Sequence, residues 1–338
     1  MRYNYLPGTS VRISLMSLGT MTFGGQTCED ESFKIMDFAY ENGINFFDTA
    51  DQYVDGEGER IVGKWLKGRR EKIILATKVG CQMGSHPNNA GLNRRNIIAA
   101  ADASLKRLQT DYLDVYYLHL PDTLTTLEET LESVSSLVKS GKVRYWGVSN
   151  YPAWQIADML AICDKRSLTP PIVTQNVYNL ITRGIEVELI PFLKAHSIGL
   201  TVFNPIAGGL LSGKHITGKP AEGTRFANNA MYHNRYWSDN NFAAVEELTA
   251  AARSFGMNIL ELSYKWCAAQ SAVTSVICGV SKKKQIEQNL AAFLNSPEIP
   301  PQLGKLCDEV WEKLTGARFG YIRSLPSTDV PDGNINTM

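Results

Sequence analysis

The sequence lacks the features that mark several common classes of protein. Its 338 residues contain no apolar run long enough to cross a bilayer, and residues 1–5 hold no apolar signal core. Lysine plus arginine and aspartate plus glutamate number 34 each, so no excess charge of one sign is available for a polyanion. We therefore expect a cytoplasmic protein with no membrane partner and no nucleic-acid partner.

Paired cysteines and metal-binding spacings are also missing. The six cysteines stand far apart, at positions 28, 81, 163, 267, 278 and 307, and the five histidines include no H-E-x-x-H. Apolar residues make up 44% of the chain, enough for a large core that needs no disulfide. We expect reduced thiols and no metal.

What the chain does have is a regular alternation of strand-like and helix-like segments. Eight apolar runs predict strands at 13–18, 44–47, 72–77, 113–118, 143–148, 172–175, 200–203 and 275–278. A helical pattern follows each run, for example over 30–42, 58–66 and 93–108. This order predicts a single α/β domain over residues 1–338, a (β/α)₈ TIM barrel. Residues 1–12 read as a capping β-hairpin, and 297–338 as a further helix near 301–315 with a polar tail. The tryptophans at 154, 266 and 311 are expected in the core.

The competing fold, a doubly wound dinucleotide domain, is not favoured. It requires G-x-G-x-x-G directly after the first strand, with an acidic residue about twenty positions on. Here that strand ends in Gly19-Thr20-Met21-Thr22-Phe23-Gly24-Gly25, which lacks the spacing. Ser212-Gly213-Lys214 likewise falls short of a P-loop.

The predicted strands end in polar residues that a barrel would bring to one face. Strands two, three and four lead to Asp48 with Tyr53, to Lys78 and to His119. A free phenol, with a pKa of about 10, is a poor proton donor near neutral pH. Lys78, held by Asp48, would lower the pKa of Tyr53, and His119 would orient a carbonyl.

Taken singly, each of these residues has an ordinary structural explanation. Asp48 and Lys78 could form a structural ion pair, and Tyr53 or His119 could be packed in the core. Four such residues at neighbouring strand ends favour a catalytic site. A Schiff-base aldolase using Lys78 is the alternative in the same fold, but Asp48 and Tyr53 argue against it.

Several motifs carry a resemblance that covers nearly the whole chain. They are Leu18-Gly19-Thr20-Met21-Thr22-Phe23-Gly24, Asp48-Thr49-Ala50-Asp51-Gln52-Tyr53, Thr77-Lys78-Val79-Gly80, Leu113 to His119, Gly147-Val148-Ser149-Asn150, Gln175, and Gly208 to Lys214. With them the chain resembles the aldo-keto reductase superfamily, in its branch of bacterial reductases and potassium-channel β-subunit-like proteins. The resemblance implies an NADPH-dependent reductase of aldehydes or ketones, with Tyr53 as general acid supported by Asp48, Lys78 and His119.

The resemblance also implies a cofactor site. It places Ser149, Asn150 and Gln175 at the nicotinamide carboxamide, which both donates and accepts hydrogen bonds. Phe203 stands where the family usually has a tyrosine or tryptophan against the nicotinamide. Lys282-Lys283-Lys284 would favour the 2′-phosphate of NADPH over NADH. The other implied cofactor residues are Gly19, Thr20, Met21, Asp48, Asn204, Pro205, Ile206, Ala207, Gly208, Lys214, Arg225, Gly279, Ser281, Gln285, Gln288 and Asn289.

The function stays open between two alternatives, and two further regions carry expectations. Relatives in the same branch serve channels by sensing NADPH, so a regulatory subunit with weak reductase activity is the alternative function. Segment 205–238 is expected to have little core of its own and to close over the cofactor. The substrate pocket is expected to be apolar, lined by residues such as Met21, Phe23, Met83, Tyr151, Tyr232 and Trp237.

Overall fold

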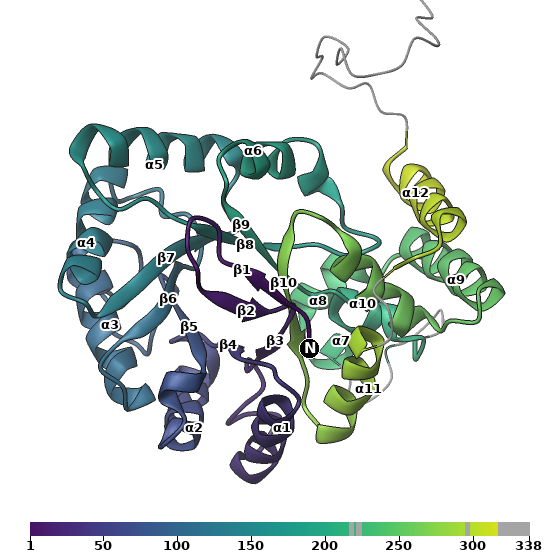
Figure 1. The fold of residues 1–338 in the computed structure, drawn as a ribbon, viewed down its shortest axis with the longest axis horizontal. Coiled ribbons are helices and arrows are strands. Elements are labelled where there is room, and N and C mark those ends of the chain that lie inside the picture. Colours follow the sequence, from purple (N-terminus) through teal and green to yellow (C-terminus); the bar gives the residue numbers. More distant parts are fainter. Residues whose placement is uncertain (216–219, 221–224, 295–297, 317–338) are drawn as a thin grey trace, which may run out of the picture.

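Eight parallel strands close into a barrel in the computed structural model, which describes all residues except 216–219, 221–224, 295–297 and 317–338 (Figure 1). β10 lies between β9 and β3, and every other neighbour follows in chain order. This confirms the predicted TIM barrel. The strands are β3 (Met16–Gly19), β4 (Phe46–Asp48), β5 (Ile74–Val79), β6 (Leu113–Leu118), β7 (Val143–Ser149), β8 (Val173–Val177), β9 (Gly199–Phe203) and β10 (Val273–Gly279).

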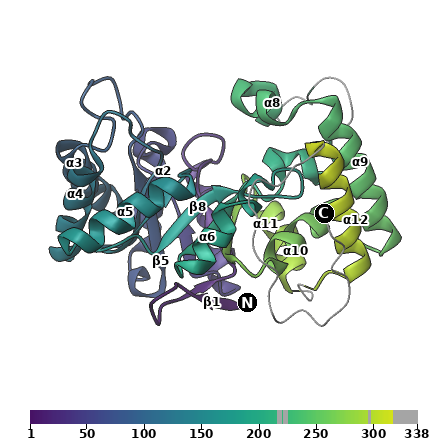
Figure 2. The ribbon, with the colours of Figure 1, turned by 90° about the horizontal axis from the view of Figure 1, so that it is seen from above.

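Helices surround the barrel, and most begin where the sequence predicts. Asn93 caps its helix as expected, because its side chain accepts a hydrogen bond from the Asn96 amide. The outer helices are α1 (Glu29–Glu41), α2 (Glu57–Leu66), α3 (Arg94–Leu108), α4 (Leu127–Lys139), α5 (Ala153–Arg166), α6 (Leu189–Ala195), α10 (Ile259–Ala269) and α11 (Lys283–Leu294). α9 (Asp239–Ser254) and α12 (Pro301–Thr315) pack against each other at one side (Figure 2).

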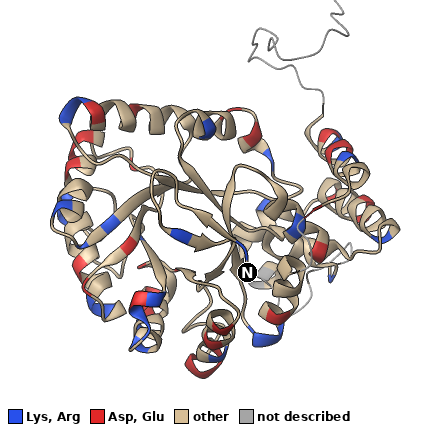
Figure 3. Cartoon of the chain, in the orientation of Figure 1, with Lys and Arg blue, Asp and Glu red and all other residues tan. Residues whose placement is uncertain are grey.

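Short elements complete the chain. Short turns form at η1 (Tyr53–Gly56), η2 (Arg70–Lys72) and η3 (Gly184–Glu186). Segment 205–238 contains η4 (Ala207–Ser212), α7 (Arg225–Asn228) and α8 (Ala230–Tyr236). Lys, Arg, Asp and Glu are mixed along the outer helices (Figure 3). In the described part of the chain, no helix is long and apolar enough to span a bilayer, and no cluster of ligating side chains could hold a metal ion.

The N-terminal hairpin closes one end of the barrel. β1 (Tyr3–Tyr5) pairs antiparallel with β2 (Arg12–Ser14), and the pair lies across the ring of strands in Figure 1. Leu6 and Ile13 are fully buried and join the barrel interior. The predicted strand 13–18 was therefore wrong in its start, since Ile13 belongs to the hairpin and the barrel strand begins at Met16.

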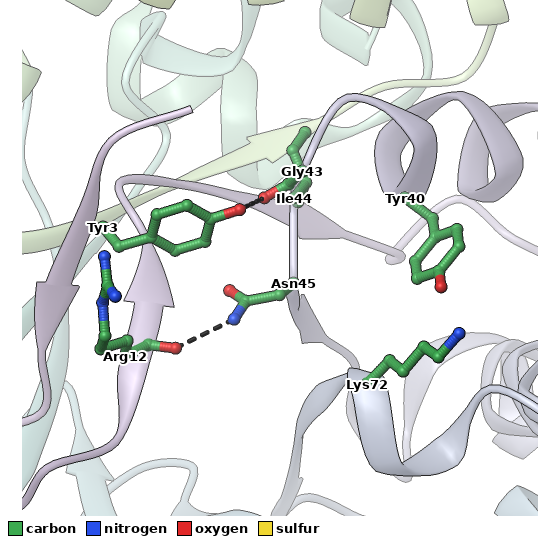
Figure 4. A pocket seen from close by; sticks show the side chains of 7 residues that line it. All are labelled: Tyr3, Arg12, Tyr40, Gly43, Ile44, Asn45 and Lys72. Atoms are coloured by element: carbon green, nitrogen blue, oxygen red, sulfur yellow. Dashed lines mark hydrogen bonds between the residues drawn. The ribbon is translucent and has the colours of Figure 1, made fainter.

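Several hydrogen bonds fasten the hairpin to the barrel, and Figure 4 shows two of them. The Tyr3 hydroxyl donates to the Gly43 carbonyl over 2.8 Å, and Asn45 Nδ2 donates to the Arg12 carbonyl over 2.9 Å. A surface pocket of about 400 Å³ remains beside them, lined also by Tyr40 and Lys72. It lies at the amino ends of the strands, opposite the ends that carry the ionisable residues.

The three tryptophans expected in the core have three different environments. Trp266 is buried as predicted, with 3% of its surface exposed, and Trp311 is half-buried. Trp154 is 59% exposed, so that prediction was wrong. The reason is helical phase, because α5 buries Ala153, Ile156, Met159 and Cys163 and turns position 154 outward.

Candidate active site

The structure brings the four predicted ionisable residues together at the carboxyl ends of β4, β5 and β6. Lys78 has no exposed surface, and its ammonium lies 2.5 Å from Asp48 Oδ1, 2.8 Å from the Thr49 carbonyl and 3.3 Å from the Tyr53 hydroxyl. All three N–H groups of the ammonium are therefore used. This fixes the position of the charge next to the phenol.

Burial and charge act in opposite directions on this pair. Burial alone would lower the pKa of Lys78, but Asp48 and Tyr53 outweigh it and the pKa is raised, so the ammonium stays charged. Burial raises the pKa of Tyr53, Lys78 opposes the rise and Asp48 adds to it. The net pKa of Tyr53 is raised. Lys78 therefore acts on the pKa of Tyr53 in the expected direction, but burial outweighs the ammonium.

His119 follows β6 and its ring meets the ring of Tyr53 edge-on, with centroids 6.1 Å apart. Burial, together with the charge of Lys78, lowers the pKa of His119 to about 3. The imidazole is thus neutral at physiological pH, with one N–H to donate. Its Nδ1 is buried without a hydrogen-bond partner among the described residues. The ring can therefore orient a bound carbonyl without adding a charge.

The second oxygen of Asp48 is held by a residue that the sequence placed elsewhere. Gln175, at β8, donates from Nε2 to Asp48 Oδ2 over 2.8 Å. The resemblance assigned Gln175 to the nicotinamide carboxamide. In this structure its N–H₂ group donates to the carboxylate instead. Thr20 adds a hydrogen bond from its hydroxyl to the Asp48 carbonyl.

Two asparagines, Asn150 and Asn204, follow β7 and β9. Asn150 has a left-handed backbone, with φ of 64°, and its side chain donates to Ser149 Oγ and to the His119 carbonyl, each over 3.0 Å. Asn204 is also left-handed, and its Nδ2 is buried without a partner among the described residues. Phe203 is half-buried beside it. An orphaned amide next to an aromatic face suits a carboxamide-bearing ring.

The next turn has a left-handed backbone. Ala207, Gly208 and Gly209 have φ of 48°, 69° and 115°, and the Ala207 and Gly209 amides donate to the Asn204 and Ile206 carbonyls inside the turn. Pro205 is buried, Ile206 is half-buried, and Lys214 is exposed at the end of this turn. These residues fit a dinucleotide pyrophosphate. Arg225 begins α7, but its side chain lies outside the described residues.

The predicted adenosine residues divide into two groups. A Cβ at Gly279 would meet no atom within 4 Å, and Ser281, Gln288 and the three lysines at 282–284 reach the surface. Gln285 caps α11, accepting from the Ser281 and Lys282 amides. Asn289 is 4% exposed and donates to Cys278 Sγ over 3.1 Å. A ligand at this surface would meet Gly279, Ser281 and Gln288 before Asn289.

Segment 205–238 has more core than its composition indicated. Leu210, Leu211, Phe226, Tyr232 and Tyr236 are buried. The rings of His215, Phe226, Trp237 and Phe242 form a chain of contacts with centroids 4.9–5.6 Å apart. The expectation of little core was wrong for the described part of the segment. The sequence did not reveal this core, because its aromatic residues are far apart in the segment and come together only in the folded chain.

The residues expected to line the substrate pocket differ in how exposed they are. Phe23, Tyr151 and Tyr232 are buried, with 0%, 3% and 4% exposed, so they pack inside the protein. Met83 and Trp237 are half-buried, and Met21 is 40% exposed. Of this set, Met21 is the most accessible to a bound molecule.

Two features of the site escaped the sequence analysis. Asp51 is 1% exposed and its Oδ1 has no hydrogen-bond partner among the described residues. Val54 has φ of 51° and ψ of 49°, and Asp55 and Gly56 continue this left-handed turn. A β-branched residue in this conformation is strained by about 1–3 kcal/mol. The sequence carries no signal for either feature except the glycine at 56.

Comparison with known proteins agrees with this geometry. A model of the Aldo/keto reductase family matches residues 15–312. A "Probable voltage-gated potassium channel subunit beta" of Arabidopsis thaliana is 36% identical over 89% of this chain and 94% of its own. A protein of the same name from Oryza sativa is 35% identical over 90% and 94%. An "Uncharacterized oxidoreductase YrpG" of Bacillus subtilis is 36% identical over 86% and 91%.

Proposed function

The chain belongs to the aldo/keto reductase family, and from this premise we propose that it is an NADPH-dependent oxidoreductase that reduces aldehydes or ketones to alcohols. The observation that carries the proposal is the Lys78 ammonium held between Asp48 Oδ1 and the Tyr53 hydroxyl. The Tyr53 hydroxyl accepts the third hydrogen bond of this buried ammonium. The ammonium orients the phenol and stabilises the charge that forms when the phenol gives up its proton.

Each residue then has a defined role in reduction. When bound, NADPH supplies a hydride to the carbonyl carbon. Tyr53 donates its hydroxyl proton to the carbonyl oxygen, which becomes the alcohol. Lys78 stabilises the phenolate left on Tyr53, and Asp48, fixed by Gln175, keeps Lys78 in place. Neutral His119 orients the carbonyl oxygen by donating a hydrogen bond.

The residues proposed to hold NADPH follow the same face of the barrel. Ser149, Asn150 and Gln175 would bind the carboxamide, and the ring of Phe203 would lie against the nicotinamide. The turn from Asn204 to Gly208, with Lys214, would hold the pyrophosphate. The exposed lysines at 282–284 would attract the 2′-phosphate.

A second candidate is a channel-associated regulatory subunit, because two of the relatives are named as channel β-subunits. In regulatory proteins of this branch, the position that corresponds to His119 tends to carry another residue. The histidine is present in this chain. The complete set of Asp48, Tyr53, Lys78 and His119 favours the enzyme.

The decisive experiment compares the wild type with Tyr53→Phe. Purified protein is mixed with NADPH and a panel of aldehydes and ketones while NADPH absorbance is followed. We expect Tyr53→Phe to lower the rate of carbonyl reduction by a factor of about 10²–10⁴. Its NADPH affinity, measured by fluorescence titration, should stay near the wild-type value.

Tyr5→Phe is the matched control, since Tyr5 is 60% exposed on the hairpin, far along the chain from the site. It should keep full activity. A Tyr53→Phe variant that retained more than about a tenth of the wild-type rate would exclude Tyr53 as the general acid. A wild type that binds NADPH but reduces no carbonyl would support the regulatory candidate.

A further inference from the structure

The surface pocket beside the N-terminal hairpin has no part in the proposed reaction. Its volume is about 400 Å³, within the range that is typical of small-molecule sites. It lies at the amino ends of the strands, so a ligand held there would not compete with a carbonyl compound or with NADPH. The residues that line it come from the hairpin, from the end of α1 with the turn into β4, and from η2: Tyr3, Arg12, Tyr40, Gly43, Ile44, Asn45 and Lys72.

Hydrogen bonds fix the middle wall of this pocket, which is the turn from α1 to β4. The Gly43 carbonyl accepts from the Tyr3 hydroxyl over 2.8 Å. Asn45 uses both ends of its amide, because Nδ2 donates to the Arg12 carbonyl over 2.9 Å and Oδ1 accepts from the Ser14 amide over 2.8 Å. The wall is therefore formed before any ligand binds, and recognition depends on the side chains on either side of it.

A cation lies over a tyrosine ring on each side of this wall (Figure 4). Arg12 Cζ is 5.4 Å from the centre of the Tyr3 ring, and Lys72 Nζ is 6.0 Å from that of Tyr40. The Tyr40 ring is itself held edge-on against Trp65, with centroids 5.9 Å apart. Both cations are exposed, and neither pairs with a carboxylate among the described residues. Their N–H groups are available to a ligand.

The charge of the lining is of one sign. Among the described residues no carboxylate lines the pocket. Glu41 and Glu71, the chain neighbours of Tyr40 and Lys72, are exposed, so solvent screens their charges. Two positive charges without a negative one favour a dianion. A phosphate monoester is close to a dianion at neutral pH, and arginine and lysine both bind phosphate.

We propose that this pocket binds a small organic phosphate, namely a phosphate monoester with a flat aromatic or heterocyclic body. The planar fork of Arg12 holds the phosphate oxygens, and Lys72 adds a point charge. The body lies against the rings of Tyr3 and Tyr40, which accounts for a pocket larger than a free phosphate ion needs. The inference does not depend on the proposed reductase function, because the two sites share no residue.

Phenyl phosphate is the probe for the test, because it joins a dianionic phosphate to an aromatic ring. It is titrated into the full-length protein at neutral pH and low ionic strength, and binding is followed by isothermal titration calorimetry. Arg12→Gln and Lys72→Gln remove a charge from an exposed side chain, so both variants should fold. We expect each to raise the Kd about three- to tenfold. The double variant should show no measurable binding.

Two control variants show where the phosphate binds. Arg144 is also exposed and lies over a tyrosine ring, 4.8 Å from the centre of Tyr112, but it does not line the pocket. Arg144→Gln should therefore leave the Kd unchanged. Lys214→Gln tests the turn proposed for the cofactor pyrophosphate. The inference is overturned if the wild type does not bind phenyl phosphate, if Arg144→Gln weakens binding as much as Arg12→Gln does, or if only Lys214→Gln weakens it.

Inorganic phosphate and phenol test the two parts of the ligand separately. We expect each to bind the wild type about tenfold or more weakly than phenyl phosphate does. Tyr40→Leu keeps both cations, so it should weaken phenyl phosphate and leave the binding of inorganic phosphate unchanged, which also shows that the variant is folded. Inorganic phosphate that binds as tightly as phenyl phosphate would overturn the assignment of an organic ligand.

Discussion

Asp51 should limit the stability of this protein at alkaline pH. Burial raises its pKa from 3.8 to about 7, Glu59 adds to the rise, and the Gln52 amide, Arg107 and Lys78 oppose it. The Arg107 guanidinium lowers the pKa of Asp51 only in part, and its Nε donates to Glu59 over 2.6 Å. Asp51 also acts on the Cys81 thiol and the Tyr116 phenol. The pKa of each is raised, mainly by burial, so both groups are neutral.

The sign follows from the raised pKa. Between pH 3.8 and about 7 the folded protein keeps a proton on Asp51 that the unfolded chain has lost. Stability therefore falls as pH rises through this window, and above it the full cost is present. The pKa difference corresponds to at most about 4 kcal/mol. Between about pH 5.5 and about pH 8.5 the cost should grow by about 2 kcal/mol.

Replacing Asp51 by Asn keeps the shape and removes the titration. The stability of Asp51→Asn relative to the wild type should increase by about 2 kcal/mol from about pH 5.5 to about pH 8.5. For a chain of this length that is about 3 °C in the thermal midpoint. The assay is thermal unfolding of both proteins at the two pH values, followed by circular dichroism.

Asp55→Asn is the matched control, since Asp55 is exposed on the same turn. Its midpoint should follow the wild type at both pH values. If Asp51→Asn also follows the wild type, Asp51 is ionised in the folded protein and the reasoning from burial is wrong.

Three other outcomes can be checked. Replacing Lys282 and Lys283 together by Ala should raise the Kd for NADPH more than for NADH, less so in high salt, as fluorescence titration would measure. Gly63→Ala should cost about 1–3 kcal/mol in urea unfolding, because its Cβ would lie 2.5 Å from the Arg107 carbonyl in α3. Since the pKa of His119 is about 3, His119→Asn should lower the reduction rate without moving either limb of the pH–rate profile between about pH 5 and 9.

The sequence alone determined the barrel and the four ionisable residues. Apolar runs and capping residues are local signals, and they placed β6 and the start of α3 within a residue of their observed bounds. The barrel topology then groups the residues at the strand ends, because the carboxyl ends of all the parallel strands lie at one face. Asp48, Lys78 and His119 could therefore be grouped from strand order before any distance was known.

Tertiary structure decided everything that depends on what surrounds a side chain. Strand order could not show that Gln175 would bind Asp48, that burial would outweigh Lys78 at Tyr53, or that Trp154 would face outward. Desolvation sums over neighbours from many elements, and a one-residue change of helical phase reverses exposure. Asp51 and Val54 show this most clearly, because Asp51 lies within the motif from Asp48 to Tyr53 and Val54 directly follows it. Only the folded chain reveals Asp51 as a buried carboxyl group whose Oδ1 has no partner among the described residues, and Val54 as a strained valine next to Tyr53.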